Sequence, residues 1–307
     1  MTTPVVVASG ATKRYGEVLG LNGFTAEFGP GITGLVGPNG AGKSTFFRVL
    51  AGQLHLDAGQ ITILGRPSSA PVRSNHEVGY CPESPTLYEW MSAEEFLRSL
   101  LRLDGFEESE ARRRCTEALA QVDLLSSRDR KLAGFSRGMR QRVKIAQALA
   151  HDPTLLLLDE PLNALDPVSR AHLLDLFTRL AESGRHIILS SHVLYEVERL
   201  TDQIVMMSNG RAIAQGDLHQ IRDLIDTRPL TVEVTTPDPR ALGRALAGWE
   251  HVTDVSFPGP DKVVAQTRSP DTFYRALGEL ARTGDVPIRG VRGTDDNLEA
   301  VFRLLAE

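Results

Sequence analysis

Hydrophobic and polar residues follow different periods in successive parts of the chain. Residues 5–36 alternate between apolar and polar positions, which predicts β-strands. From about residue 85 to 150 apolar residues recur at helical spacing, and beyond this stretch strand and helix patterns alternate. Such alternation is typical of a mostly parallel sheet. Residues 1–222 therefore predict an α/β domain with antiparallel strands at its start and a helical subdomain at about 85–150.

The pattern changes again in the tail, near residue 227. In order, it predicts a strand, a helix, two strands, a helix, a strand and a last helix, over residues 230–236, 238–249, 252–257, 262–268, 270–284, 286–293 and 296–307. The first six of these elements have the βαββαβ order of a ferredoxin-like α+β unit of about 80 residues. We therefore expect a second, ferredoxin-like domain at residues 227–307.

The composition narrows the class of protein. The chain has 307 residues and a net charge of −5, which gives no sign of a nucleic-acid partner. Its two cysteines make no disulfide framework and suit a reducing compartment. The first residues lack the pattern of a secretory signal, and no apolar run approaches the roughly 18 residues that span a bilayer. We expect a globular protein without direct membrane insertion, which can still dock on a membrane protein.

A glycine-rich stretch, GPNGAGKST, follows a predicted strand and precedes a predicted helix. It matches the phosphate-loop pattern G-x-x-x-x-G-K-[ST], in which backbone N–H groups surround phosphate oxygens at the positive end of a helix. The lysine adds charge on the outer phosphates and the serine hydroxyl can bind Mg²⁺. The chain has five lysines against 29 arginines, so a lysine here is not background usage. The candidate nucleotide-binding residues are Gly37, Pro38, Asn39, Gly40, Ala41, Gly42, Lys43, Ser44 and Thr45.

Two acids follow a run of four leucines in the stretch TLLLLDE. A strand that is apolar on both faces is typical of the centre of a parallel sheet, and ligands bind at the carboxyl ends of such strands. We expect Asp159 to hold Mg²⁺, directly or through water, and Glu160 to polarise the water that attacks the γ-phosphate. His192 follows another apolar strand at the same edge of the sheet, where it can hydrogen-bond the γ-phosphate.

Several motifs in a fixed order make the sequence resemble the ATP-binding subunits of ATP-binding cassette (ABC) transporters. Along residues 10–215 they are GPNGAGKST, the loop after VGYC, FSRGM, LLLLDEP, NALD and SSH. In that family the motif like FSRGM contacts the γ-phosphate held by a second subunit. The resemblance implies a head-to-tail dimer with ATP between the subunits, in which Ser136, Arg137 and Gly138 lie at a helix N-terminus against the partner's nucleotide.

The resemblance also implies roles for residues outside these motifs. Asp166 in NALDP matches the loop that crosses the dimer interface, and Tyr15 matches the aromatic residue that stacks on adenine. Two positions depart from the family's usual sequence. FSRGM replaces Leu-Ser-Gly-Gly-Gln, and Glu83 replaces a glutamine that contacts Mg²⁺. Glu83 is therefore a candidate metal ligand beside Ser44 and Asp159.

The segment that follows residue 83 is where such subunits meet a separate membrane permease. Its aromatic residues, Tyr88, Trp90 and Phe96, either form an exposed surface for a cytoplasmic helix of that permease or pack within the helical subdomain. We expect the basic residues of the signature helix to be mostly solvated; they are Arg137, Arg140, Arg142 and Lys144.

The resemblance favours the ATPase subunit of an exporter, with ATP and Mg²⁺ as cofactors, working as a dimer at the cytoplasmic face of the membrane. DNA-repair ATPases of this type need a long coiled coil where this chain has about 90 residues, and translation ATPases carry two cassettes. An alternative is a soluble ABC-type ATPase whose tail senses a ligand. A GTPase is disfavoured because the N-K-x-D motif is absent. The cargo, and the choice between homodimer and heterodimer, stay open.

Overall fold

The structure is a computed structural model of the chain, and it describes residues 3–68, 76–83, 87–163, 165–218, 221, 229–283 and 286–293. The chain forms two compact units, Met1–Asp217 and Leu218–Glu307. The expected domain boundary at 222–227 and the expected last helix at 296–307 lie outside the described residues. Within the described residues no helix is long and apolar enough to cross a bilayer.

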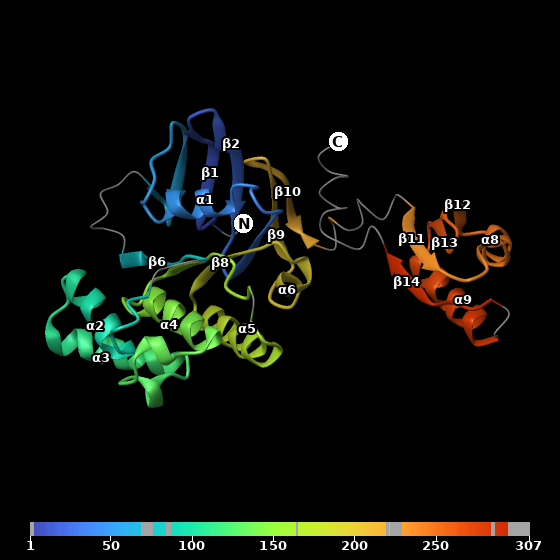
Figure 1. The fold of residues 1–307 in the computed structure, drawn as a ribbon. Coiled ribbons are helices and arrows are strands. Elements are labelled where there is room, and N and C mark those ends of the chain that lie inside the picture. The colour runs from blue at the N-terminus through green and yellow to red at the C-terminus, as the bar shows by residue number, and fades with distance from the viewer. Residues whose placement is uncertain are drawn as a thin grey trace. The chain divides into compact units, whose positions relative to one another are not determined.

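Two β-sheets form the frame of the first unit (Figure 1). One is antiparallel with strand order β2-β1-β4-β5, and the other has order β10-β9-β3-β8-β7-β6. In the second sheet only β10 runs antiparallel to its neighbour. The strands are β1 (Val6–Tyr15), β2 (Val18–Phe28), β3 (Ile32–Val36), β4 (Ala58–Ile63), β5 (Arg66–Pro67), β6 (Val78–Cys81), β7 (Leu155–Leu158), β8 (His186–Ser191), β9 (Gln203–Ser208) and β10 (Arg211–Asp217). The predicted mixed α/β core is confirmed.

Helices cover the second sheet and build the helical subdomain. They are α1 (Lys43–Leu50), α2 (Ala93–Leu103), α3 (Glu108–Gln121), α4 (Arg137–Leu149), α5 (Pro167–Glu182) and α6 (Leu194–Glu198). Helix α2 begins with a capping box, in which Ser92 Oγ accepts from the Glu95 N–H and the Glu95 carboxylate accepts from the Ser92 N–H. Helices α2, α3 and α4 pack on one another (Figure 1), so α4 connects this subdomain to the sheet.

The core fixes the place of α1 against both sheets. Phe46 on α1 stacks on Phe24 and Phe28 of β2, with ring centroids 4.7 and 5.3 Å apart. The same apolar cluster includes residues of the second sheet, among them Leu155 and Leu157 of β7. All of β7 is buried, because a central strand of a parallel sheet is covered on both faces. This packing holds the start of α1 close to the carboxyl ends of β7 and β8.

The second unit is a smaller α+β fold with its own core. Its elements are β11 (Leu230–Thr235), α8 (Pro239–Ala247), β12 (Val252–Gly259), β13 (Lys262–Thr267), α9 (Pro270–Thr283) and β14 (Gly290–Gly293). The strands form one antiparallel sheet in the order β12-β13-β11-β14. Val232 and Val234 of β11 pack with Leu242 of α8 and Phe273 of α9. Both helices therefore bury apolar side chains against the sheet.

The three aromatic residues of the helical subdomain differ in their exposure, and one basic residue of α4 is buried where we expected it to be solvated. Tyr88 and Trp90 are 52% and 70% exposed, whereas Phe96 is buried on the apolar face of α2. The expectation that the basic residues of α4 are solvated holds for Arg137 but is wrong for Lys144, which is 9% exposed. The Lys144 ammonium is directed to the loop after β6, where it donates a hydrogen bond to the carbonyl oxygen of Glu83.

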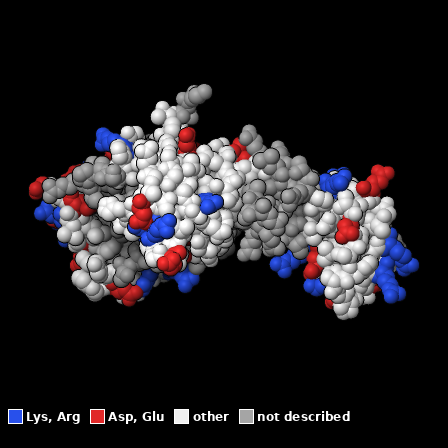
Figure 2. Space-filling model, turned by 90° about the horizontal axis from the view of Figure 1, so that it is seen from above, with Lys and Arg blue, Asp and Glu red and all other residues white. Residues whose placement is uncertain are grey.

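Charged residues are interspersed on the face of the molecule drawn in Figure 2. Over the first unit, lysine and arginine lie there among aspartate, glutamate and neutral residues, whereas several basic side chains gather at one edge of the second unit. The net charge is −5.

Candidate nucleotide-hydrolysis site

The phosphate loop connects β3 to α1 and requires glycine at two close backbone contacts. Gly42 has a φ of 108°, and a Cβ there would lie 2.3 Å from the carbonyl oxygen of Gly20. A Cβ on Gly37 would lie 2.4 Å from the carbonyl oxygen of Met207. Any side chain at either position would collide with backbone atoms. The loop ends at the N-terminus of α1, where backbone N–H groups and the helix dipole favour an anion such as phosphate.

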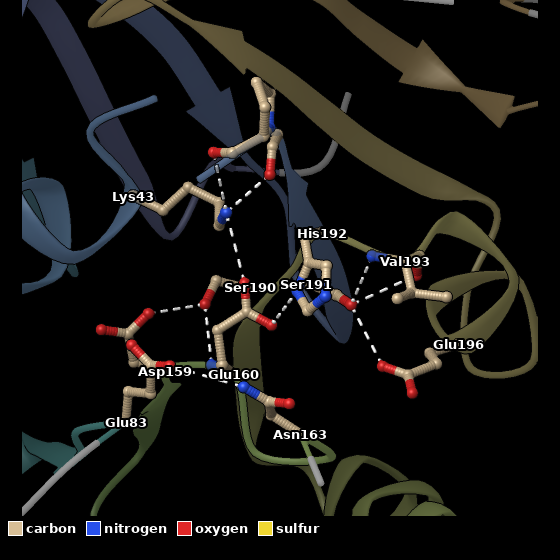
Figure 3. Close-up of polar contacts among 12 residues, drawn as sticks. Lys43, Glu83, Asp159, Glu160, Asn163, Ser190, Ser191, His192, Val193 and Glu196 are labelled. Atoms are coloured by element: carbon tan, nitrogen blue, oxygen red, sulfur yellow. Dashed lines mark hydrogen bonds and ion pairs between the residues drawn. The ribbon is translucent and has the colours of Figure 1, made fainter. Parts of the chain in front are cut away.

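Lys43, the first residue of α1, is folded onto the loop that precedes it (Figure 3). Its ammonium donates hydrogen bonds to the carbonyl oxygens of Gly37, at 2.6 Å, and Pro38, at 3.3 Å. It also forms an ion pair with Glu160, with 3.2 Å between Nζ and Oε1. Both side chains are buried, with 6% and 7% exposed. The cation therefore lies between the phosphate loop and the acid.

The two acids lie at the carboxyl end of β7 and are joined through β8. Ser190 Oγ donates to Asp159 Oδ1 at 2.7 Å and accepts from the Glu160 N–H at 2.9 Å. Glu160 has a φ of 47°, a left-handed conformation that is uncommon outside glycine. Backbone strain of this kind persists where surrounding contacts fix it, and it is frequent at functional sites.

His192 completes a line of charged and polar groups across the sheet edge. Its Nδ1 lies 2.9 Å from Glu160 Oε2 (Figure 3). The carboxylate of Glu160 thus faces Lys43 with one oxygen and His192 with the other. The imidazole is 37% exposed, so the line runs from a buried lysine to the solvent-facing side of the site. The structure brings together the phosphate-loop lysine, both acids and the histidine.

The oxygen atoms around Asp159 suit a hard divalent cation. Burial raises the pKa of this carboxyl, hydrogen bonds from Ser190 and Ser44 oppose the rise, and the carboxylates of Glu160 and Glu83 add to it. A bound cation would relieve the cost of this buried charge. Within the described parts of the chain no three His, Cys, Asp or Glu side chains are grouped to hold an ion by themselves. Mg²⁺ fits this pattern, because it is held through one or two carboxylates together with phosphates and waters.

Comparison with known proteins identifies the family. The sequence profile of the ABC transporter family matches residues 21–163. The chain is 31% identical to the daunorubicin/doxorubicin resistance ATP-binding protein DrrA of Streptomyces peucetius, over 99% of this chain and 92% of that protein. The chain belongs to the ATP-binding proteins of ABC transporters. As an ABC ATPase, it binds and hydrolyses ATP.

Two further relatives match this chain over most of their own length. The ABC ATPase is 36% identical to the linearmycin resistance ATP-binding protein LnrL of Bacillus subtilis (strain 168), over 96% of this chain and 96% of that protein. It also matches the solved structure of an ATP-binding subunit of an ABC transporter with a TM-score of 0.63 and 32% identity, over 72% of this chain and 93% of the other. The resemblance drawn from the motifs is therefore confirmed.

The signature of the ABC ATPase lies beside its NALDP loop. Ser136 caps α4 by accepting from an N–H of the first turn, at 3.3 Å, and Arg137 is exposed. A Cβ on Gly138 would lie 2.9 Å from Ser169 Oγ on α5. Asp166 caps α5 by accepting from the N–H and Oγ of Ser169, and the hydrogen bond from this N–H lowers the pKa of Asp166. These predicted site residues are grouped with one another, at the starts of α4 and α5.

Glu83 lies where three parts of the ABC ATPase meet. Its Oε1 accepts from Asn163 Nδ2, on the loop after Glu160, at 3.4 Å. Its backbone carbonyl accepts from Lys144 Nζ, on α4, at 2.6 Å. Burial lowers the pKa of Lys144. The buried lysine therefore ties the signature helix to the loop after β6, and the exposed carboxylate of Glu83 lies on the side of Asn163.

Tyr15 ends β1 beside the phosphate loop. A Cβ on Gly20 would lie 2.7 Å from Tyr15 Cε2 and 3.0 Å from Thr45 Oγ1, so the ring and the first turn of α1 flank the same piece of backbone. The tyrosine is 43% exposed. An exposed aromatic ring at this place can stack on a base.

Sequence reasoning missed a set of buried polar residues behind the site, namely Ser190, Ser191 and Glu196. They are 0%, 2% and 7% exposed. The two serines could have been noticed, because they end an apolar strand next to His192 and buried hydroxyls need hydrogen-bond partners. The burial of Glu196 could not, because a five-residue helix gives too short a pattern to show which face is covered.

Proposed function

We propose that the chain is the ATP-hydrolysing subunit of an exporter, and that ATP-driven dimerisation powers a partner membrane permease. The contacts of Lys43, Glu160 and His192 carry this proposal, because they place a phosphate-binding cation, a candidate base and a candidate phosphate ligand in one line. Two relatives are named for resistance to daunorubicin/doxorubicin and to linearmycin. Removal of a toxic compound from the cell is a direct route to such resistance, which supports export.

In this proposal Glu160 is the general base of hydrolysis. Its carboxylate accepts a proton from water as that water attacks the γ-phosphate. Lys43 contacts one oxygen of this carboxylate. His192 orients the other carboxylate oxygen and reaches toward the γ-phosphate, and Tyr15 stacks on adenine.

Mg²⁺ would neutralise charge on the β- and γ-phosphate oxygens. Ser44 and Asp159 would hold it, and Glu83 would stand nearby on the loop after β6. The support for this assignment is the buried Asp159 carboxylate, whose neighbours supply oxygen atoms and further negative charge. In such a site the protein orients two ligands, and phosphate and water complete the shell.

A second subunit, most simply a second copy of this chain, would complete each site. Ser136, Arg137, Gly138 and Asp166 would then contact the partner's nucleotide and the interface. Two features support this arrangement. The residues lie at the N-termini of α4 and α5, where helix dipoles and free N–H groups favour an anion. The side chains of Ser136 and Asp166 form hydrogen bonds within the first turns of these two helices and none of these bonds reaches the phosphate loop of the same chain.

The permease would dock on the helical subdomain at the cytoplasmic face of the membrane. Tyr88 and Trp90 give an exposed aromatic pair, with ring centroids 5.9 Å apart. A cavity of about 750 Å³ adjoins this subdomain, and its lining includes Tyr80, Leu103 and His151. An amphipathic helix of a partner can bury apolar side chains in such a hollow. Specific drug or lipid cargo would contact the permease.

We further propose a two-domain organisation, 1–222 and 227–307, with a ferredoxin-like second domain. The strand order β12-β13-β11-β14, with helices after β11 and β13, supports that fold. The independent apolar core of this domain favours one alternative function, a soluble ABC-type ATPase regulated by a ligand of the tail. Stimulation of ATP hydrolysis by a small molecule without any permease would favour this alternative.

The experiment that tests the proposed function is the turnover of Glu160→Gln. We expect a fall of about 10²–10⁴-fold in kcat with ATP binding retained, because the amide fills the same space but cannot accept the proton. Glu182→Gln, at the exposed end of α5, is the matched control and should keep the parent rate. A Glu160→Gln protein that hydrolyses ATP near the parent rate would remove the residue from its assigned role.

A further inference from the structure

A second carboxylate, that of Glu196, lies beside the hydrolysis site, next to Ser191 and Val193 (Figure 3). It lies on α6, the short helix after β8, and is 7% exposed. Burial of a carboxylate is costly unless partners compensate it. Its two oxygen atoms contact two different elements of the domain, and each of these elements leads to a residue of the proposed site.

The first contact builds the turn that carries His192. Ser191 Oγ lies 3.1 Å from Glu196 Oε2 and 3.2 Å from the carbonyl oxygen of Val193, so its single proton is donated to one of these two acceptors. Ser191 Oγ also accepts a hydrogen bond from the Val193 N–H at 3.0 Å. Ser191 and Val193 flank His192 in the chain. With the proton donated to Glu196, the carboxylate would hold the hydroxyl around which the histidine turn is formed.

The second contact leads to the interface loop. Glu196 Oε1 lies 3.4 Å from Arg170 Nε, on α5. The two groups form an ion pair that lacks the geometry of a hydrogen bond. The guanidinium of Arg170 also donates to the carbonyl oxygen of Leu165 at 3.4 Å. Leu165 directly precedes Asp166. Arg170 therefore holds the end of the loop from which Asp166 caps α5.

We propose that Glu196 is a positioning residue, which couples the turn of His192 to the loop of Asp166. A buried carboxylate whose two oxygen atoms have different partners tolerates little displacement, because movement of either loop alone leaves one of these oxygen atoms without its partner. Closure of the dimer against Asp166 would in this way set the place of His192 beside Glu160. The inference rests on the roles of His192 and Asp166 in the proposed function.

The test is steady-state ATP hydrolysis by the full chain with Mg²⁺ present. Glu196→Ala should lower kcat about tenfold to a hundredfold, since misplacing a reacting group by about 1 Å has an effect of this order. The KM for ATP should stay within about twofold of the parent, because the phosphate loop is untouched. Glu196→Gln keeps an oxygen for Ser191 but loses the charge for Arg170. Its kcat should therefore lie between those of the parent and of Glu196→Ala.

Non-additivity separates coupling from a local packing defect. Ser191→Ala and Arg170→Met should each lower kcat in the parent, and neither should lower it further in Glu196→Ala. Independent, multiplying effects would overturn the proposal. So would a Glu196→Ala enzyme that matches the Glu182→Gln control, or one whose KM rises while kcat is kept.

Two checks keep the outcomes distinct. A parent protein that does not hydrolyse ATP contradicts the proposed function, whereas an active parent with an unaffected Glu196→Ala variant contradicts only the coupling. Thermal unfolding of each variant is followed in parallel. If Glu196→Ala does not fold, the double variant Ser191→Ala/Arg170→Met replaces it: a kcat no lower than that of the worse single variant supports the coupling, and multiplied losses refute it.

Discussion

Replacement of Lys43 by methionine tests how much the buried ion pair with Glu160 stabilises the fold. Methionine preserves most of the packing volume and removes the charge. The charged atoms are 3.2 Å apart, and an effective dielectric constant of about 20 gives a Coulomb attraction of about 5 kcal/mol. Desolvation of both ions offsets most of this attraction. Removal of one partner is different, because an uncompensated buried charge costs about 3–5 kcal/mol.

The contact with His192 reduces the expected loss. Its Nδ1 lies 2.9 Å from the second oxygen of Glu160, and a hydrogen bond from this nitrogen would leave the carboxylate with one partner. We therefore expect Lys43→Met to lower the free energy of unfolding by about 2–4 kcal/mol. The double variant Lys43→Met/Glu160→Gln should regain at least half of this, because a neutral amide is less costly to bury than an unpaired carboxylate.

Urea unfolding followed by circular dichroism measures these differences as shifts of the midpoint at constant slope. Lys131→Met is the matched control, because that lysine is 61% exposed and its ion pair lies at the surface. It should change stability by less than about 0.5 kcal/mol. A Lys43→Met protein as stable as this control, or a double variant less stable than Lys43→Met, would refute the reasoning.

Three further predictions concern the nucleotide loop, the base-stacking residue and the cysteines. Gly42→Ala should lower ATP affinity and stability more than Gly40→Ala, because both have positive φ but only the Cβ at Gly42 meets a backbone atom; equal losses by calorimetry would contradict this. Tyr15→Ala should raise the KM for ATP about 5- to 150-fold at unchanged kcat, from the roughly 1–3 kcal/mol of base stacking, whereas an unchanged KM would exclude the stacking role. Burial raises the pKa of Cys81 to about 12 and of Cys115 to about 11, so a thiol reagent at pH 8 should label neither in the native protein and both in urea. Rapid native labelling would contradict that prediction.

Local sequence rules carried the prediction of the site because parallel strands share a carboxyl edge. Asp159, Glu160 and His192 each follow an apolar strand, and β7 and β8 are hydrogen-bonded neighbours, so their ends meet beside the phosphate loop. The position of these residues in sequence was therefore enough to expect them in one place. The ion pair of Lys43 with Glu160 was not predictable, since it depends on which conformation the flexible lysine side chain adopts.

Side chains on the helices were harder to assign. Lys144 belongs to the basic residues of α4, and Phe96 to the aromatic residues of the helical subdomain. Each group has both buried and exposed members, and the element that packs against the helix decides which are buried. Phe96 could have been assigned, because it shares an apolar stripe with Leu97 and Leu101 on α2. The burial of Lys144 could not, because its partner is a backbone carbonyl at residue 83, distant in the sequence.

The measurement that tests the central claim most directly is the mass of purified Glu160→Gln protein in solution, by size-exclusion chromatography with light scattering. The account predicts a monomer of 33.6 kDa without nucleotide and a dimer of twice that mass with ATP and Mg²⁺. Addition of Ser136→Arg to the same protein should prevent the dimer, because the signature would no longer fit the partner's nucleotide. A mass that ATP does not change, or a dimer that survives Ser136→Arg, would contradict a nucleotide site shared between two subunits.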